Sequence, residues 1–489
     1  MLADYAPIFP ELFLALSALV LLMWGVFHRY GAGLSISIVS IFVLAGAGLL
    51  IARQPATTED LFNGAFVNDS FARFMKVLVL AGSAFAIVLS LDYMRRERLL
   101  RFEYPVLILL STAGMMLTIS ANDLISLYLA LEFQSLALYV LASFHRDHLR
   151  STEAGLKYFI LGVLSSGLLL YGSSLVYGYT GMTSFAGIAG AAQAHGAPVG
   201  FVFGLVFVLA GLAFKISAVP FHMWTPDVYE GAPTPVTAYF AAGAKISAMG
   251  MMIRVILGAF PDAAAQWQQI IIAISIGSMA LGAFAAIGQQ NIKRLLAYSS
   301  IGHVGYALIG LAAVVPPTGA SAEEILKVQT EGVSSVLIYF AIYLAMTLGS
   351  FACVLAMRSG HAMSESISDL AGISKEKPLF AFLFAMLLFS LAGIPPLAGF
   401  FAKFYVFNAA IQAHLYWLAV VGVVLSVVSA YYYLRVVKVM YFDDKGAIFE
   451  PIPGPVQLTL GLSAAFVIFF FLSPSTLKAA ADVASRSLF

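Results

Sequence analysis

The stretch Gly200-Phe-Val-Phe-Gly-Leu-Val-Phe-Val-Leu-Ala-Gly-Leu-Ala-Phe-Lys215-Ile-Ser-Ala-Val-Pro220-Phe221 carries one charged side chain, Lys215, in a long apolar run. An apolar run of this length crosses the hydrocarbon core of a bilayer, about 30 Å thick, as a single helix. Pro220 lacks a backbone donor and its ring clashes with the preceding turn, so we expect this helix to be interrupted within the membrane. The stretch therefore predicts a membrane span with a buried charge beside a helix break.

Apolar runs of the same kind recur along the whole chain. Of its 489 residues, 61% are hydrophobic and 10% are charged, whereas a soluble globular chain is roughly one quarter charged. We therefore predict an all-α polytopic membrane protein with about fourteen transmembrane helices and no soluble domain. The expected spans lie near residues 8–27, 33–52, 74–92, 105–121, 123–144, 156–179, 200–221, 234–258, 268–288, 294–314, 333–357, 379–407, 415–438 and 456–473. The segment Met1-Leu-Ala-Asp-Tyr5 lacks the basic region of a cleavable signal, so the first span is expected to be retained.

The basic residues of the loops divide unequally between the two membrane faces when successive spans alternate in direction. One face collects Arg29, Arg95, Arg96, Arg98, Arg101, Arg146, Arg150, Lys293, Arg294, Arg358, Lys375, Lys377, Arg435, Lys438 and Lys445. The other face collects only Arg53, Arg73, Lys76, Lys327, Lys478 and Arg486. By the positive-inside rule the first face is cytoplasmic. This predicts a multi-pass protein of the bacterial inner membrane with both termini on the periplasmic side.

Four ionisable side chains stand out inside the expected spans: Glu132, Lys215, Lys245 and Lys403. Each charge at mid-bilayer costs at least about 2.5–3.5 kcal/mol on insertion scales. A single buried Glu–Lys pair that locks two helices together is a purely structural explanation. One acid cannot neutralise three lysines, however, and the surplus lysines favour a function in moving protons. A lysine in a low-dielectric site near another cation loses part of its preference for the charged form, so it can take up and release a proton.

A second helix break precedes Lys403, in the segment Gly393-Ile-Pro395-Pro396-Leu-Ala-Gly399. The surrounding stretch 379–407 is too long for one straight span of about 20 residues. Paired broken helices in the two halves of a chain are typical of inverted-repeat transporters, with sites at the breaks. We therefore predict two related units at 105–258 and 268–438. Three further spans precede them within 1–104, and one follows within 439–489.

Other polar residues are weaker candidates. His303 falls inside the tenth span, where it either relays a proton or is a hydrogen-bonded core histidine. His222 lies near the first helix break and is a candidate relay. Lys157 begins the sixth span, where it either snorkels to the interface or modulates the Glu132 site. The lone Cys353 excludes disulfides and Cys-ligated iron–sulfur centres within one chain.

The sequence contains no metal, nucleotide or flavin motif, so we expect this chain to bind no metal and no cofactor. The formal net charge of +1 gives no indication of a nucleic-acid partner. Any energy input must therefore reach this chain from other proteins or from an ion gradient.

A family resemblance rests on the segment Pro220-Phe-His-Met-Trp-Thr-Pro-Asp-Val-Tyr-Glu-Gly-Ala-Pro-Thr-Pro-Val-Thr-Ala-Tyr239, with Lys215 before it and Lys245 after it. The Glu132 segment, the run from Asn291 to His303 and the run from Gly393 to Lys403 agree with it. The chain resembles the antiporter-like membrane subunits of proton-translocating NADH:quinone oxidoreductase, respiratory complex I. In the other antiporter-like subunits of that complex, a different sequence block follows the broken helix, and the largest of them adds a long lateral helix. The sequence therefore favours one particular member among these subunits.

This resemblance implies fourteen helices, inverted repeats in spans four to eight and nine to thirteen, and broken helices seven and twelve. It implies that Glu132 and Lys215 form the interacting pair, Lys245 is the central relay and Lys403 is the terminal site. The eleventh span, 333–357, lies between Lys245 and Lys403 in this route and offers no ionisable side chain. A relay there would depend on His303, on tyrosines such as Tyr339 and Tyr343, or on water.

The resemblance also implies partners and cofactors outside this chain. NADH, FMN, iron–sulfur clusters and quinone would be bound by partner subunits of the respiratory chain complex. This chain would contact sister antiporter-like subunits, small membrane subunits and lipids, and would act in a translocase without redox chemistry of its own. Two alternatives stay open: a subunit of a cation/proton antiporter, and a non-transporting membrane scaffold.

Overall fold

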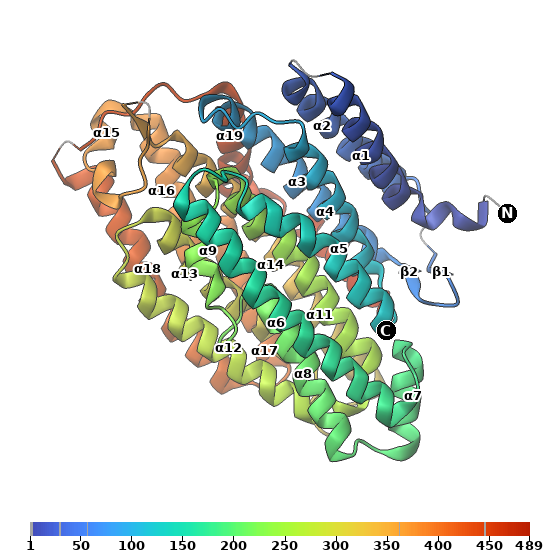
Figure 1. Ribbon diagram of the computed structural model, residues 1–489. Helices are drawn as coiled ribbons and strands as arrows, with labels where there is room; N and C mark the ends of the chain where they lie inside the picture. The colour runs from blue at the N-terminus through green and yellow to red at the C-terminus, as the bar shows by residue number, and fades with distance from the viewer. Residues whose placement is uncertain (1–2, 29–30, 56, 361, 445) are drawn as a thin grey trace.

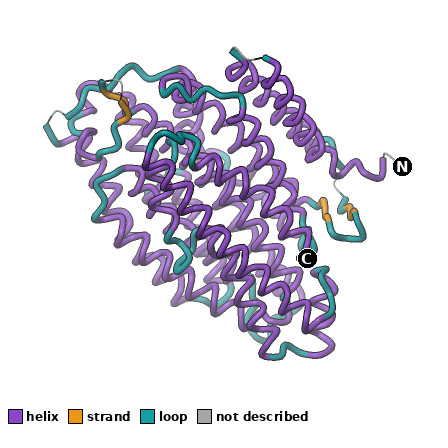
Figure 2. The backbone as a smooth tube through the Cα atoms, in the orientation of Figure 1, coloured by secondary structure: helices purple, strands orange, loops and turns teal. Residues whose placement is uncertain are grey.

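The computed structural model describes residues 3–28, 31–55, 57–360, 362–444 and 446–489. Long helices run roughly side by side through the whole molecule (Figure 1), and the loops gather at the two ends of the bundle (Figure 2). Within the described residues, strands form only two small hairpins, β1 (Glu59–Leu61) with β2 (Phe66–Asn68) and β3 (Arg358–Ser359) with β4 (Ala362–Met363). Arg29 and Lys445, two of the predicted basic loop residues, lie outside the described residues.

Thirteen helices of the described chain are long and apolar enough to cross a membrane. They are α1 (Phe9–Phe27) with the preceding turn η1 (Ala3–Ile8), α2 (Ala32–Ala52), α3 (Ser70–Arg96), α4 (Glu103–Ser120), α5 (Leu124–Ala142), α6 (Leu149–Thr180), α8 (Val199–Ile216), the continuous helix formed by α10 (Thr234–Tyr239), η2 (Phe240–Ala244) and α11 (Lys245–Ala259), η3 (Pro261–Ala263) with α12 (Ala264–Ile287), α13 (Ile292–Ala312), α14 (Ala322–Ala356), α18 (Tyr416–Phe442), and α19 (Gly454–Phe469) with η5 (Phe470–Leu472). Two shorter helices, α16 (Pro378–Ala392) and α17 (Ala398–Gln412), follow one another in the stretch predicted as the twelfth span. The predicted all-α membrane fold is confirmed.

Both predicted helix breaks are present. After α8, Ser217 takes a left-handed backbone conformation with φ of 64°, and the short helix α9 (Trp224–Gly231) follows. After α16, Gly393 has a φ of 90°, and α17 begins beyond Pro395 and Pro396. Glycine is required in the second break, because a Cβ on Gly399 would lie 1.8 Å from the carbonyl oxygen of Ser390. The proline signal therefore located both interruptions.

Several helix ends differ from the prediction because hydropathy detects only the part of a helix that lies in lipid. Helix α14 begins at Ala322, well before the predicted start at 333, and its polar first turn is closed by a capping box. In that box Ser321 Oγ accepts a hydrogen bond from the Glu324 amide, and the Glu324 carboxylate accepts one from the Ser321 amide. Four helical segments in loops and at the chain end were also not predicted: α7 (Phe185–His195), η4 (Ile367–Leu370), α15 (Ile373–Glu376) and α20 (Pro474–Arg486).

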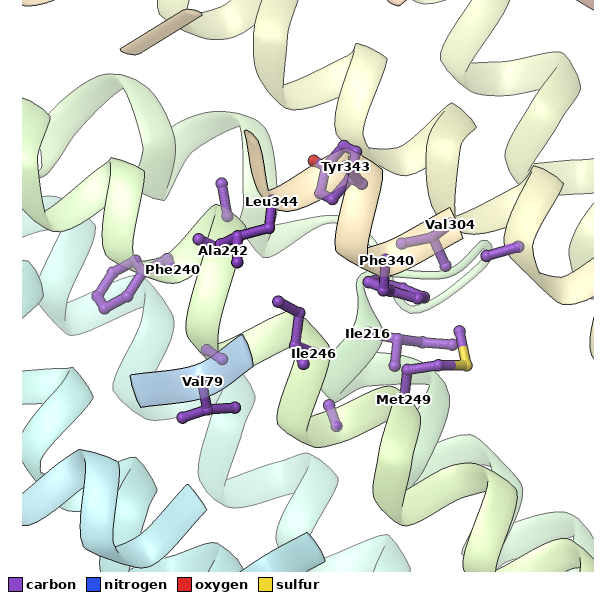
Figure 3. Packing of buried hydrophobic residues seen from close by; sticks show 14 of the residues in the cluster. Val79, Ile216, Phe240, Ala242, Ile246, Met249, Val304, Phe340, Tyr343 and Leu344 are labelled. Atoms are coloured by element: carbon purple, nitrogen blue, oxygen red, sulfur yellow. The ribbon is translucent and has the colours of Figure 1, made fainter. Parts of the chain in front are cut away.

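The helices that carry the central residues lie in the interior of the bundle. Almost every side chain of α11 and α13 is buried, as is that of α14 from Gly332 onward, whereas α6 and α18 expose large apolar side chains. Figure 3 shows apolar side chains from α3, α8, η2, α11, α13 and α14 packed against one another in this interior. The packed interior fixes the relative positions of the lysine-bearing helices.

Candidate functional site

The three predicted lysines and His303 are all buried in the bundle. The exposed fractions are 7% for Lys215, 1% for Lys245, 3% for His303 and 5% for Lys403. The residues come from four different helices, α8, α11, α13 and α17. Glu132, on α5, is only partly buried. Four ionisable groups in an apolar interior need polar partners, and the partners define the site.

Lys215 lies at the end of α8, beside the first break. Its ammonium donates a hydrogen bond to Ser135 Oγ at 3.0 Å and lies 6.0 Å from the centre of the Tyr139 ring. Ser135 follows Glu132 by about one turn of α5. The described residues show no ion pair between Lys215 and Glu132, and the buried Oε1 of Glu132 accepts no hydrogen bond from them. A serine hydroxyl therefore holds the lysine one turn away from the carboxylate.

Lys245 follows directly on η2, a π-helical turn within the span. Its ammonium donates to Ser300 Oγ on α13, and the Tyr343 hydroxyl on α14 donates to the same oxygen at 2.6 Å. The Tyr229 ring lies 5.3 Å from the ammonium. Ser300 thus joins the central lysine to a tyrosine of the eleventh span.

His303 lies between two tyrosines of neighbouring helices. Its Nδ1 is 2.6 Å from the Tyr339 hydroxyl on α14, and its Nε2 is 3.2 Å from the Tyr433 hydroxyl on α18. Ser299 Oγ lies 2.5 Å from the same Tyr433 hydroxyl. The centres of the His303 and Tyr343 rings are 5.3 Å apart. The structure therefore brings together His303, Tyr339 and Tyr343, the relay residues proposed from the sequence.

Lys403 bridges the second break. Its ammonium donates to the carbonyl oxygen of Ala392, the last residue of α16, at 2.8 Å, and to Ser426 Oγ on α18 at 2.7 Å. The Tyr306 ring on α13 lies 4.8 Å from the ammonium. A carbonyl at a helix C-terminus carries partial negative charge, so it favours a cation. The break thus supplies part of the lysine's binding site.

Two of the sequence candidates lie apart from this row. His222 is half-buried in the first break, and its buried Nδ1 has no hydrogen-bond partner among the described residues. Lys157 is 42% exposed and forms ion pairs of 2.8 Å with Glu153 and with Asp227. Burial raises the pKa of the Asp227 carboxyl, but hydrogen bonds from Lys157 and Arg294 outweigh burial and leave that pKa below its usual value. Lys157 is therefore part of an ion-pair network outside the bundle interior.

The serines that bind the lysines were not found from the sequence, because serine is frequent in packed membrane helices and carries no charge. Buried ion pairs were also missed. Lys76, predicted as a loop residue, is fully buried at 2.6 Å from Glu11 of the first span. Arg254 likewise forms two hydrogen bonds of 2.9 Å with Asp69.

Fold and site together define a polytopic membrane protein with two broken-helix spans and a row of lysines joined to hydroxyl groups. Residues 121–429 match the family model described as the transmembrane region of the NADH:quinone oxidoreductase/Mrp antiporter family. The chain belongs to this family. The family member favoured by the sequence is subunit N, and the relatives below confirm that resemblance.

Relatives named NADH-quinone oxidoreductase subunit N match over nearly the whole chain. The protein from Parvibaculum lavamentivorans is 56% identical over 99% of this chain and 98% of its own length. The protein from Methylobacterium nodulans is 58% identical over 99% and 98%. Among solved structures, a chain of respiratory complex I from Thermus thermophilus has a TM-score of 0.80 at 29% identity, covering 96% of this chain and 98% of that chain. A chain of the Mrp complex from Dietzia shares the fold, with a TM-score of 0.84 at 21% identity over 100% and 98%.

Proposed function

We propose that this chain, as a membrane subunit of a proton-translocating NADH:quinone oxidoreductase, moves protons along the row Glu132, Lys215, Lys245, His303 and Lys403. The names of its relatives support the assignment to that complex. The observation that carries the route is the bridge at Ser300, which accepts hydrogen bonds from Lys245 and from Tyr343. It extends the central lysine into the eleventh span, where the sequence offers no ionisable side chain.

The route continues through hydroxyl and imidazole groups. In one concerted transfer, the Lys245 ammonium gives a proton to Ser300 Oγ, Ser300 passes its own hydroxyl proton to the Tyr343 oxygen, and Tyr343 releases its phenolic proton towards His303. The Tyr343 ring is 5.3 Å from the His303 ring, so a small movement of either side chain connects them. From His303, Tyr339 and Tyr433 are both within hydrogen-bond reach. Lys403 is the last site, bound across the second break.

Lys215 acts as the switch in this proposal. While the Lys215 ammonium is bound to Ser135, Lys215 and Glu132 are not paired. Moving the ammonium by about one helical turn towards Glu132 closes the pair and removes a positive influence from the central lysine. Charge in a low-dielectric interior acts over longer distances than in water, so the state of the pair biases proton occupancy at Lys245. Redox chemistry in partner subunits would drive the change.

The setting of the chain is also part of the proposal. NADH, FMN, iron–sulfur clusters and quinone are assigned to partner subunits, and sister antiporter-like and small membrane subunits are its neighbours. We assign it to the bacterial inner membrane with both termini periplasmic, on the distribution of basic loop residues. The related units are placed at 105–258 and 268–438, each containing one break.

The experiment is NADH-driven proton uptake into inverted membrane vesicles, comparing wild type with Lys215→Met, with the amount of assembled complex measured in each. Lys438→Met is the control, because Lys438 is 62% exposed and, among the described residues, pairs only with Asp443. We expect proton uptake and coupled turnover to fall together in the first variant only. Wild-type values for Lys215→Met would show that the buried charges are structural, as in a scaffold. Sodium-dependent exchange without NADH would favour the antiporter alternative.

A further inference from the structure

Tyr239 ends the sequence block that carries the family resemblance, yet the proton route does not use it. It is fully buried, and it is the last residue of α10 before the π-helical turn Phe240–Ala244. Lys245 is the first residue after that turn. Tyr239 and Lys245 therefore stand at opposite ends of one irregular turn.

The Tyr239 hydroxyl is fixed by two side chains of α4. It lies 2.5 Å from Ser111 Oγ and 3.0 Å from Thr112 Oγ1. Thr112 in turn donates to Ser83 Oγ of α3 at 2.8 Å. This cluster, Tyr239, Ser111, Thr112 and Ser83, connects α10 with two helices that precede the region matched by the family model.

Helix α3 also packs closely against the π-helical turn itself. A Cβ on Gly82 of α3 would lie 3.4 Å from the Gly243 amide nitrogen and 3.6 Å from Ala242 Cβ. Figure 3 shows Ala242 beside Leu344, on the segment that leads to Ile246. The turn is thus enclosed on its α3 side and anchored at its start by Tyr239.

The π-helical turn determines the direction in which Lys245 points. A π-turn contains one residue more than an α-helical turn, so it rotates the following residues by about 100°, the angle per residue of an α-helix. In this register the Lys245 ammonium meets Ser300. A return to regular α-helix would turn the lysine away from that hydroxyl.

We propose that Tyr239 is a positioning residue for Lys245: its hydroxyl, bound by Ser111 and Thr112, fixes the start of the π-helical turn and so aims the lysine at Ser300. The inference rests on the proposed function, because it gives the Lys245–Ser300 contact a role in proton transfer. It assigns to α3 and α4 the task of aligning a site that they do not themselves line.

The test measures NADH-driven proton uptake per assembled complex in Tyr239→Phe and Thr112→Val. Both variants remove the hydrogen bond between Tyr239 and Thr112, and Tyr239→Phe also removes the one with Ser111. Thr118→Val is the matched control, because Thr118 is equally buried on α4 and, within the described part of the chain, its hydroxyl bonds only to the Gly114 carbonyl of its own helix. Loss of one neutral hydrogen bond predicts a fall of about threefold to tenfold in Thr112→Val, and the fall in Tyr239→Phe should be at least as large. Thr118→Val should stay close to wild type.

A double-mutant comparison separates positioning from a general structural role. In a Ser300→Ala background the lysine has no hydroxyl to reach, so Tyr239→Phe should add no further loss. If the double variant shows the product of the losses measured in Tyr239→Phe and Ser300→Ala, the proposal is wrong. Wild-type uptake in Tyr239→Phe would also overturn it. If the complex with Tyr239→Phe fails to assemble, the same comparison is made with Thr112→Val, alone and in the Ser300→Ala background. Wild-type uptake in Ser300→Ala and Lys215→Met would instead refute the proton route itself.

Discussion

Substitution of Ser300 by alanine gives the most direct test of the route through the centre of the bundle. The change removes one hydroxyl and little volume at a position that is 2% exposed. It leaves the Lys245 ammonium and the Tyr343 hydroxyl without their common acceptor. The fold should therefore survive while the bridge between the two helices is lost.

The size of the effect follows from the kind of hydrogen bond that is removed. A hydrogen bond to a charged group contributes about 1.5–3 kcal/mol, and about 1.4 kcal/mol corresponds to a tenfold change in rate. If the bridge is used in the rate-limiting transfer, coupled proton uptake should fall by about 10- to 150-fold. Lys245 would need a new partner before it could pass on a proton.

The assay is proton uptake into inverted vesicles driven by NADH, normalised to assembled complex. Ser350→Ala is the matched control, because Ser350 is 1% exposed, lies on α14 and, of the residues that the structure describes, its hydroxyl bonds only to the Met346 carbonyl of its own helix. We expect this control to keep wild-type uptake. Uptake above half of the wild-type value in Ser300→Ala, with normal assembly, would refute a route through this serine.

Two further predictions concern the architecture around the route. Gly399→Ala should prevent assembly, because its Cβ would lie 1.8 Å from the Ser390 carbonyl oxygen. Gly461→Ala is the control, because the space around Gly461 is open, and it should assemble normally. Assembly is measured by an immunoblot of the purified complex. Lys76→Met should lower the free energy of unfolding by about 3–5 kcal/mol, since it leaves the Glu11 carboxylate buried without its partner. The double variant Glu11→Gln with Lys76→Met should recover much of that loss in a thermal melt of the detergent-solubilised complex, and a double variant no more stable than Lys76→Met would contradict this account.

The sequence predicted the features that have a strong physical signature in a membrane. Apolar runs located the spans because the hydrocarbon core sets their length, and Pro220, Pro395 and Pro396 located the breaks because proline cannot complete the backbone bonding. Lys215, Lys245 and Lys403 were identifiable because a charge in an apolar run is costly. Helix ends outside the lipid, such as the first turn of α14, have no comparable signature.

The contacts of the site could not be predicted, because they depend on how distant segments pack. Ser300 meets Lys245 from 55 positions further along the chain, and Ser135 meets Lys215 from 80 positions before it. Neither serine differs in sequence from others that bond to their own helix, such as Ser350. The π-helical turn before Lys245 is likewise hidden, since Phe240-Ala-Ala-Gly-Ala is equally suited to a regular α-helix.

The partners of the buried cations separate fixed charges from mobile ones. Lys76 and Arg254 are paired with carboxylates, Glu11 and Asp69, which hold each cation in place by an ion pair. The three lysines of the route instead each donate to a serine of a neighbouring helix.

A serine hydroxyl is both donor and acceptor, so it can accept a hydrogen bond from a lysine ammonium and donate one to the neutral amine. A carboxylate only accepts hydrogen bonds, so it cannot donate one to the nitrogen lone pair of the neutral amine. Serine partners therefore let a buried lysine lose and regain a proton without leaving an unsatisfied polar group, which costs about 1–3 kcal/mol. This difference in partners is the physical reason to place proton transfer on the lysine–serine contacts and helix locking on the ion pairs.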